Sequence, residues 1–230
     1  ADTARLLARE QPALEAGPAL LQYRNKSATP ALRREQVLAL LPGCRALGIP
    51  LLVNDDWRLA GELGADGAHL GRDDGSMAEA RAALGPSAIL GASCYDQPVL
   101  AERAAAAGAS YAAFGAFFPS GTKPLARRAD PRVLAESASL GLPRVAIGGI
   151  TPDNAASLVA AGADLVAVIG GVFDAPDPAA AVGGGPPPPP PPPPPPTPPH
   201  TPPPPPPPAP PPPPPTPPPP PPPAPYQPHC

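Results

Sequence analysis

Three polar side chains at every second position, Gln22, Arg24 and Lys26, form the first group in the sequence with a chemical pattern. They lie at the end of a short apolar segment, 20–24, which is typical of a β-strand. Alternate residues of an extended segment point the same way, so one amide and two cations would face a common ligand. This combination suits a polyanion such as a diphosphate. The same three residues, taken alone, also fit a solvated basic strand edge.

Carboxylates follow the next two apolar segments along the chain. One segment runs into Asn54 and Asp55, and the following segment is succeeded within a few residues by Asp74. Magnesium ions bind one or two protein carboxylates together with phosphate oxygens of a substrate. We therefore predict Asp55 and Asp74 as ligands of Mg²⁺, with Asn54 beside them. Aspartates in such turns also cap helices, which is the alternative interpretation.

A loop between two prolines provides a second set of hydroxyl and cationic groups. Ser120, Thr122 and Lys123 lie within this loop, and together with a glycine they would make a shaped anion-binding turn. Ser93, at the end of another apolar segment, is placed to donate a hydrogen bond to a phosphate. A plain surface turn and an ordinary strand serine are the alternatives. His69 lies inside an apolar segment, which favours a satisfied core histidine, or one that supports a neighbouring side chain, over a catalytic base.

Glycines end the last two apolar segments of the charged part of the chain. Gly149 follows one of them, and Ile169 and Gly170 end the other. Glycines there let backbone N–H groups approach a ligand, and a following helix start adds a favourable dipole. Together with the cationic group, the sequence offers one pocket for a metal-bound diphosphate and another for a single phosphate. Two phosphorylated substrates joined with loss of diphosphate is the reaction that this predicts.

Seven apolar segments alternate with helical patterns and would position these residues. The predicted strands are 20–24, 51–55, 67–71, 89–94, 111–118, 144–150 and 165–171, and the predicted helices are 2–15, 31–47, 57–63, 77–84, 99–107, 131–140 and 152–161. Such alternation is typical of a parallel sheet covered by helices. Short connections favour a (β/α)₈ TIM barrel, whose functional residues lie at the carboxyl ends of the strands. The sequence has no GxGxxG after its first strand, which argues against a dinucleotide-binding fold.

The barrel domain is predicted over residues 1–182, and its first strand has no counterpart. The chain opens on a helix pattern and on Ala rather than Met, so we expect an N-terminal truncation that leaves the strands at 20–24 and 165–171 with unpaired edges. Most of the 49 prolines fall after residue 185. We expect residues 183–230 to form a disordered, low-complexity polyproline tail, because proline lacks a backbone N–H and fixes φ.

Composition argues against several other classes of protein. A net charge of −3 gives no general attraction to nucleic acid or anionic membrane. No apolar run is long enough to span a bilayer. Three scattered cysteines, Cys44, Cys94 and Cys230, suit a reducing compartment rather than a disulfide scaffold. We expect a cytoplasmic enzyme with small-molecule substrates; the sequence leaves open whether it forms a homo-oligomer.

Six strings in the sequence resemble the thiamine-phosphate synthase family. They are LLQYRNK, LLVNDD, GADGAHLG, GAFFPSGTKP, VAIGGITPDN and GADLVAVIGGVF, in the family's order and spacing from Asp2 to Phe173. The resemblance implies a (β/α)₈ transferase that needs Mg²⁺. It would join 4-amino-5-hydroxymethyl-2-methylpyrimidine diphosphate to 4-methyl-5-(2-phosphoethyl)-thiazole, giving thiamine phosphate and diphosphate. The proline tail is not a family feature.

The resemblance also implies roles for the candidate residues. Diphosphate leaves first, a pyrimidine methyl cation forms, and the thiazole nitrogen captures it. The implied pyrimidine-diphosphate residues are Gln22, Arg24, Lys26, Asn54, Ser93 and Lys123, of which Arg24, Ser93 and Lys123 would stabilise the leaving group. The implied thiazole-phosphate residues are Ser120, Thr122, Gly149, Ile169 and Gly170, the last being Gly where the family often has Ser. Asp55 and Asp74 would hold the metal.

Two other functions remain open on the sequence alone. A related tautomerase aromatises the thiazole phosphate on the same barrel, but it does not need the diphosphate clamp and uses a histidine where this chain has Ser93. An inactive fragment, whose proline-rich tail binds a partner, is the other alternative.

Overall fold

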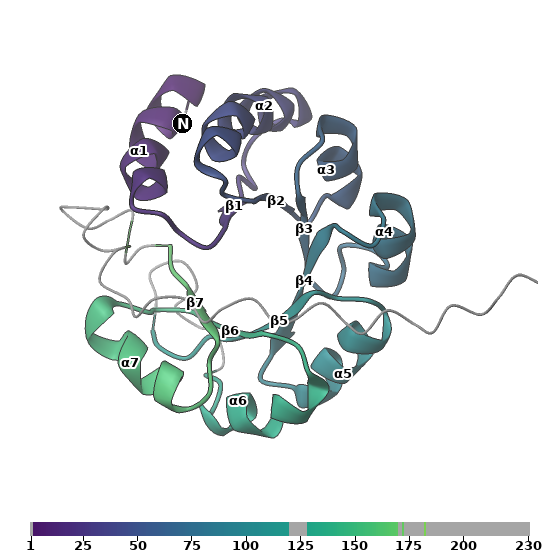
Figure 1. The fold of residues 1–230 in the computed structure, drawn as a ribbon, viewed down its shortest axis with the longest axis vertical. Helices are drawn as coiled ribbons and strands as arrows, with labels where there is room; N and C mark the ends of the chain where they lie inside the picture. The colour runs from purple at the N-terminus through teal and green to yellow at the C-terminus, as the bar shows by residue number, and fades with distance from the viewer. Residues whose placement is uncertain (1, 120–127, 170–171, 173–181, 183–230) are drawn as a thin grey trace, which may run out of the picture. The chain divides into compact units, whose positions relative to one another are not determined.

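Seven parallel strands alternate with helices in the part of the chain that the structure describes (Figure 1). The computed structural model describes residues 2–119, 128–169, 172 and 182, all of which belong to one compact unit, Ala1–Pro190. The strands are β1 Leu21–Tyr23, β2 Leu51–Asn54, β3 Gly67–Leu70, β4 Ile89–Tyr95, β5 Tyr111–Gly115, β6 Arg144–Ile147 and β7 Leu165–Ala167. The helices are α1 Thr3–Glu15, α2 Pro30–Leu47, α3 Trp57–Leu63, α4 Met77–Leu84, α5 Pro98–Ala106, α6 Arg132–Glu136, the short 3-10 helix η1 Ala138–Leu140, and α7 Pro152–Ala160.

The strands pair in their order along the chain, β1 to β7, and every pair is parallel. Figure 1 shows the sheet curled into an arc with the helices on its outer side. This confirms the expected α/β fold with a parallel sheet. Within the described ranges β1 and β7 are the two ends of the sheet, and each pairs with one neighbour. The predicted tail, 183–230, lies outside these ranges.

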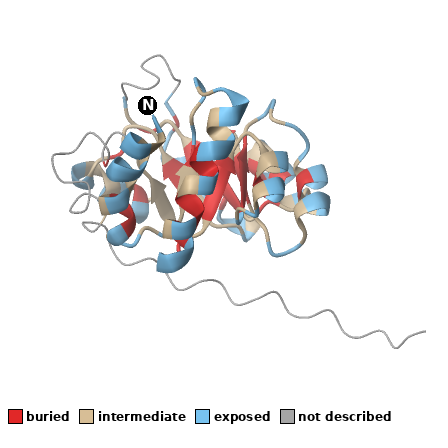
Figure 2. Cartoon of the chain, turned by 90° about the horizontal axis from the view of Figure 1, so that it is seen from above, coloured by how far each residue is buried: buried red, intermediate tan, exposed pale blue. Residues whose placement is uncertain are grey.

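Strand alternation divides the core into an outer and an inner layer. Figure 2 shows the buried residues concentrated in the central strands and the exposed residues on the surrounding helices. Leu51 and Val53 of β2 pack outward with α2 and α3, in the same cluster as Val37 and Ala60. Leu52, between them, points to the inside of the curl. It packs there with the inward side chains of the facing strands, Tyr111, Ala113 and Val145. The inner layer is therefore small, and polar side chains complete it at the carboxyl ends of the strands.

The predicted helices agree with the observed ones to within a residue or two at most ends, whereas three strands, β5, β6 and β7, end three or four residues earlier than predicted. The strand predicted over 144–150 ends at Ile147, because Gly148 and Gly149 have φ of +102° and +64° and turn the chain out of the sheet. The strands predicted over 111–118 and 165–171 end at Gly115 and Ala167. In each case the apolar run continues into the loop beyond the strand, so hydrophobicity alone overestimates the strand's length.

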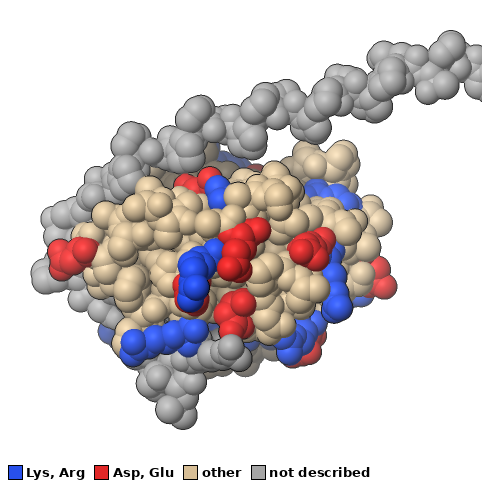
Figure 3. Space-filling view, turned by 90° about the horizontal axis from the view of Figure 1, so that it is seen from below, with Lys and Arg blue, Asp and Glu red and all other residues tan. Residues whose placement is uncertain are grey.

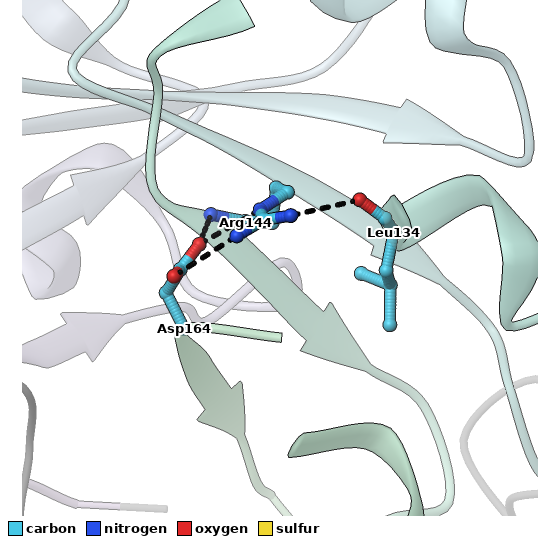
Figure 4. A network of polar contacts seen from close by, with 3 residues as sticks. All are labelled: Leu134, Arg144 and Asp164. Carbon is cyan, nitrogen blue, oxygen red and sulfur yellow. Dashed lines mark hydrogen bonds and ion pairs between the residues drawn. The ribbon is translucent and has the colours of Figure 1, made fainter. Parts of the chain in front are cut away.

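An ion pair fixes the amino ends of β6 and β7 (Figure 4). Arg144 Nε donates to Asp164 Oδ2 at 2.9 Å, and Arg144 Nη1 donates to the carbonyl of Leu134 at 3.1 Å. Partial burial raises the pKa of Asp164, but the hydrogen bonds from Arg144 outweigh it and hold that pKa below its usual value. The contacts join two strands and α6 at the face opposite the strand ends that carry the candidate site.

Glu10, on α1, gives the fold a pH-dependent stability. Burial raises the pKa of this carboxyl to about 7 against the opposing charge of Arg9, and Glu10 Oε2 has no hydrogen-bond partner among the described residues. Between the ordinary glutamate pKa of 4.5 and about 7, the folded chain binds more protons than the unfolded chain. The contribution of Glu10 to the free energy of unfolding is therefore fully present below pH 4.5 and is lost as the pH rises through about 7.

We expect Glu10→Gln to raise the free energy of unfolding at pH 8 by about 1 kcal/mol, and to change it little at pH 4.5. The value allows for solvent screening, since the carboxyl is partly exposed. Urea unfolding at the two pH values measures the difference. Glu15→Gln, an exposed substitution on the same helix, is the control and should leave the pH profile unchanged. Parallel pH profiles for the native chain and Glu10→Gln would contradict the prediction.

Candidate active site at the carboxyl ends of the strands

Two amide side chains meet where β1 and β2 end. Gln22 Nε2 donates a hydrogen bond to Asn54 Oδ1 at 2.6 Å. The strands are in register there, since Gln22 pairs with Leu52 two residues before Asn54. The hydrogen bond fixes the direction of both amides, and it leaves Asn54 Nδ2 and Gln22 Oε1 for other partners.

Lys26 and the two predicted metal ligands form one cluster beside these amides. Lys26 Nζ lies 2.9 Å from Asp55 Oδ2, and the side chains of Asp55 and Asp74 also interact directly. Asp55 has a positive φ of 66°, and its N–H donates to the carbonyl of His69 on β3 at 2.8 Å. Asp74 Oδ2 accepts from the N–H of Gly71 at 2.8 Å. The Asp74 carboxylate is therefore held by the backbone of its own turn, whereas the Asp55 backbone is tied to β3 and its carboxylate contacts Lys26.

The two carboxyl groups have pKa values shifted in opposite directions. Burial raises the pKa of Asp55, but hydrogen bonds with Lys26 and Asp74 and the charges of Lys26 and Arg24 bring it below its usual value. Burial and the adjacent Asp55 raise the pKa of Asp74. Two carboxylates in contact repel one another, and this repulsion is relieved by a proton or by a cation.

The donor set fits Mg²⁺. Within the described residues no three or more His, Cys, Asp or Glu side chains surround one point. Mg²⁺ does not need such a cage, because it keeps several waters and takes phosphate oxygens alongside one or two carboxylates. Asp55 and Asp74 are two carboxylates in contact with each other, and the ammonium of Lys26 lies beside them.

Ser93 lies on β4 and contacts the buried side chain of His69 on β3, which in turn contacts Tyr111 on β5. His69 Nε2 is 2.9 Å from Ser93 Oγ, and His69 Nδ1 is 2.8 Å from the hydroxyl of Tyr111 on β5. Burial lowers the pKa of His69 to about 4, although the charge of Asp55 opposes this shift. His69 is thus neutral near pH 7 and has both ring nitrogens engaged, which agrees with its interpretation as a supporting histidine rather than a base.

A second group lies after β6 and β7. The N–H of Thr151 donates to Asn154 Oδ1 at 2.9 Å at the start of α7, and Asn154 Nδ2 donates to the carbonyl of Gly149 at 3.1 Å. A Cβ on Gly149 would lie 2.3 Å from the carbonyl oxygen of Pro119, so only glycine fits there. Ile169, after β7, has a side chain that is 47% exposed.

The structure brings five of the predicted site residues together in two adjacent sets of contacts. Gln22 bonds to Asn54, and the next residue, Asp55, contacts both Lys26 and Asp74. Arg24 is exposed and acts on this cluster through its charge on Asp55. Four predicted residues lie outside the described part of the chain: Ser120, Thr122, Lys123 and Gly170.

Sequence reasoning missed two residues of this region, Tyr111 and Asn154. Tyr111 is the first residue of an apolar strand, which is typical of an ordinary core residue. The alternation of side chains along the strand, however, places it on the same face as Ala113, in the inner layer. Asn154 follows Thr151 by three residues, the spacing of a capping box. That spacing was visible in the sequence.

Sequence comparison places the chain in a family. The family model described as thiamine monophosphate synthase matches residues 1–172. The chain belongs to this family. The thiamine-phosphate synthase of Xanthomonas campestris pv. campestris (strain 8004) is 60% identical over 182 residues, which cover 78% of this chain and 86% of the relative. That of Xylella fastidiosa (strain 9a5c) is 56% identical over 180 residues, covering 78% and 76% respectively.

Solved structures agree with the family assignment. Thiamine phosphate pyrophosphorylase from Pyrococcus furiosus superposes with a TM-score of 0.70 at 32% identity, over 77% of this chain and 86% of that one. A 3-hexulose-6-phosphate synthase superposes with a TM-score of 0.60 at 18% identity, over 80% of this chain and 92% of its own, and shares the fold alone. The thiamine monophosphate synthase family therefore accounts for both the sequence and the arrangement of strands.

Two further observations concern the surface of this family member. None of the helices in the described ranges has the length and apolar character to cross a membrane. On the face shown in Figure 3, acidic and basic side chains lie intermixed and form no continuous basic patch.

Proposed function

We propose that this chain is a magnesium-dependent transferase that makes thiamine phosphate from a pyrimidine methyl diphosphate and a thiazole phosphate. The family match over residues 1–172 carries this proposal, because this range contains the whole cluster of Lys26, Asp55 and Asp74. Relatives that are 56% to 60% identical to it over 180 to 182 aligned residues are named thiamine-phosphate synthase. The geometry of the cluster supports a diphosphate substrate in particular.

The pyrimidine diphosphate would bind at the ends of β1 and β2. Gln22 and Asn54, oriented by their mutual hydrogen bond at 2.6 Å, supply an amide donor and an amide acceptor. These groups suit the amino and ring-nitrogen groups of the pyrimidine. Arg24 and Lys26 supply positive charge to the diphosphate, and the ion pair with Asp55 holds Lys26 in place before substrate arrives.

Asp55 and Asp74 would hold Mg²⁺ between them. The chemistry that Mg²⁺ supplies when bound is positive charge for the departing diphosphate. The carboxylates contribute by their fixed positions, since the backbone N–H of Gly71 and the turn at Asp55 hold them before the metal binds. Lys26 remains available to the phosphate oxygens once a cation takes over its role at Asp55.

The thiazole phosphate would bind after β6 and β7. Gly149, Ile169 and Gly170 would present backbone N–H groups to it, and the amino end of α7 adds a favourable dipole. Ser120 and Thr122 would position this side of the site from the preceding loop. Gly149 itself packs closely against the backbone carbonyls of Phe118 and Pro119, which fixes the turn after β6.

The reaction exchanges one bond for another. The carbon–oxygen bond of the pyrimidine methylene breaks, and diphosphate leaves with the electron pair. The lone pair of the thiazole nitrogen then forms the new carbon–nitrogen bond, which gives thiamine phosphate. Arg24, Ser93 and Lys123 would stabilise the growing negative charge on the leaving diphosphate, so catalysis here is positioning and charge stabilisation without a covalent enzyme intermediate.

The finer features of the fold and its location belong to the same proposal. The curled seven-stranded sheet corresponds to seven strands of a (β/α)₈ barrel over residues 1–182. We assign residues 183–230 to a disordered polyproline tail with no part in catalysis. Two buried free thiols, Cys44 and Cys94, support a reducing, cytoplasmic location.

The test is an assay of the full chain with both phosphorylated substrates, with and without Mg²⁺. Thiamine phosphate is followed by the fluorescence of its thiochrome derivative. Product that depends on Mg²⁺ and on both substrates is the expected result. Isomerisation of the thiazole phosphate without the pyrimidine substrate would instead identify a tautomerase, and the absence of any reaction would overturn the proposed activity.

A further inference from the structure

Three side chains from neighbouring strands form a continuous hydrogen-bonded row inside the curl of the sheet. The hydroxyl of Tyr111 on β5 lies 2.8 Å from His69 Nδ1 on β3, and His69 Nε2 lies 2.9 Å from Ser93 Oγ on β4. The rings of Tyr111 and His69 are stacked, with centroids 5.6 Å apart. Only Ser93 is partly exposed, so the row runs from the core toward the candidate diphosphate site.

Gly91 makes room for this row. It lies on β4 opposite His69, in register with it. A Cβ there would lie 2.1 Å from Cζ of Tyr111, 2.3 Å from its hydroxyl oxygen and 2.5 Å from His69 Nδ1. No other residue type would leave the hydrogen bond between Tyr111 and His69 intact. The space on β4 is therefore matched to that hydrogen bond.

The burial of Tyr111 decides the direction of the hydrogen bonds. Tyr111 is 6% exposed, and within the described residues its hydroxyl bonds to His69 Nδ1. A buried hydroxyl hydrogen needs an acceptor, and the unprotonated Nδ1 is that acceptor. A neutral imidazole that accepts at Nδ1 carries its proton on Nε2. His69 Nε2 then donates to Ser93 Oγ, which leaves the hydrogen of that hydroxyl unused.

The opposite direction of these hydrogen bonds would leave the buried hydroxyl hydrogen of Tyr111 without an acceptor in the described part of the chain. If His69 carried its proton on Nδ1, Tyr111 would accept that hydrogen bond and its own buried hydrogen would have no acceptor among the described residues. Ser93 would have to donate its hydrogen to Nε2, and it would then face a ligand with lone pairs only. Such a serine would repel a phosphate oxygen.

We propose that Tyr111 and His69 are positioning residues, which fix His69 as its Nε2–H tautomer and so keep the Ser93 hydroxyl hydrogen free to donate to a ligand diphosphate. The role rests on the proposed function in taking diphosphate as the ligand. Tyr111 and His69 do not touch the ligand. They act through Ser93.

The tautomer of His69 is measured directly by NMR. The full chain is labelled with ¹⁵N-histidine, and a long-range ¹H–¹⁵N correlation spectrum without ligand shows which ring nitrogen carries the proton. The chain has 3 histidines, and His200→Gln and His229→Gln identify the signals of the other two. We expect His69 as Nε2–H, and a mixture of tautomers in Tyr111→Phe. An Nδ1–H form, or a mixture in the unsubstituted chain, would overturn the proposal.

A double-mutant cycle on diphosphate affinity tests the action through Ser93. Inorganic diphosphate is titrated calorimetrically at a fixed excess of Mg²⁺. We expect Ser93→Ala to weaken binding about tenfold and Tyr111→Phe about fivefold, as loss of a hydrogen bond to a charged group implies. In the Ser93→Ala background Tyr111→Phe should have no further effect. An equal loss in both backgrounds would show that Tyr111 acts structurally.

Tyr23→Phe is the matched control. Tyr23 is also a buried strand tyrosine, but its hydroxyl bonds to Gln36 Oε1 at 2.7 Å, away from Ser93. It should leave both the tautomer of His69 and the affinity for diphosphate unchanged.

The proposed role of Tyr111 and His69 can fail independently of the proposed synthase activity. A chain that makes thiamine phosphate but holds His69 as Nδ1–H would disprove the role of Tyr111 alone. A chain that passes the NMR test and the cycle but makes no thiamine phosphate would disprove the synthase alone.

Discussion

Asp55→Ala should lower magnesium-dependent turnover at least about 100-fold and leave the fold intact. The substitution removes one of the two carboxylates that contact each other and the partner that holds Lys26 at 2.9 Å. It therefore affects both the predicted metal site and the lysine that faces the diphosphate. Initial rates of thiamine phosphate formation, measured over a range of Mg²⁺ concentrations, give the effect.

The neighbouring aspartate provides the control for this experiment. Asp56 Oδ1 accepts a hydrogen bond from the N–H of Leu59 at 2.9 Å and caps α3. Asp56→Ala should lower the free energy of unfolding by about 1 kcal/mol, as the loss of an N-cap does, and should keep the native turnover. Equal turnover in the two variants would show that Asp55 is not a ligand of the metal.

The sequence was sufficient to predict the elements and most members of the cluster. Each strand carries an apolar run, and most of the described helices begin at a residue whose side chain caps them, so the apolar periodicity and the helix start signals agree with the fold. Asn54, Asp55 and Asp74 follow successive strands, and carboxyl ends of parallel strands meet at one edge of a sheet. Their closeness in space therefore followed from the topology.

The contacts between side chains were beyond the sequence. Nothing in the pattern around Lys26 shows that its ammonium lies against Asp55, because this depends on the turn at Asp55 with its φ of 66°. The row from Tyr111 to Ser93 depends on the register of three strands and on the space at Gly91. Strand register is a property of the whole sheet, and an apolar run does not reveal it.

Arg81, on α4, is another residue that the sequence did not single out, and its contacts predict a large effect on stability. Its guanidinium donates to five acceptors within 3.2 Å, in the turns that precede β4 and β5. They are the carbonyls of Gly85, Pro86, Ala88 and Gly108 and the hydroxyl of Ser110. Ser110 Oγ in turn accepts from the N–H of Leu90 at 3.0 Å. One side chain thus joins two turns at the amino ends of neighbouring strands.

We expect Arg81→Ala to lower the free energy of unfolding by about 3 kcal/mol, because several carbonyls in these turns lose a charged donor together. A loss of this size corresponds to a fall in Tm of roughly 10 °C for a domain of this length. Thermal unfolding followed by circular dichroism measures it. Turnover of the folded fraction should not change, since Arg81 lies at the amino ends of the strands and the candidate site at their carboxyl ends.

Arg45→Ala is the control that distinguishes the loss of the Arg81 hydrogen-bond network from the loss of any arginine side chain. Within the described part of the chain, Arg45 Nη2 makes one hydrogen bond, at 2.9 Å, to the carbonyl of Gly64, and the residue is exposed. Its removal should cost less than about 1 kcal/mol. If Arg81→Ala were no more destabilising than Arg45→Ala, the turns before β4 and β5 would hold without the guanidinium. A fall in turnover at 25 °C, where the Arg81→Ala chain is still folded, would instead link this end of the sheet to the site at the other.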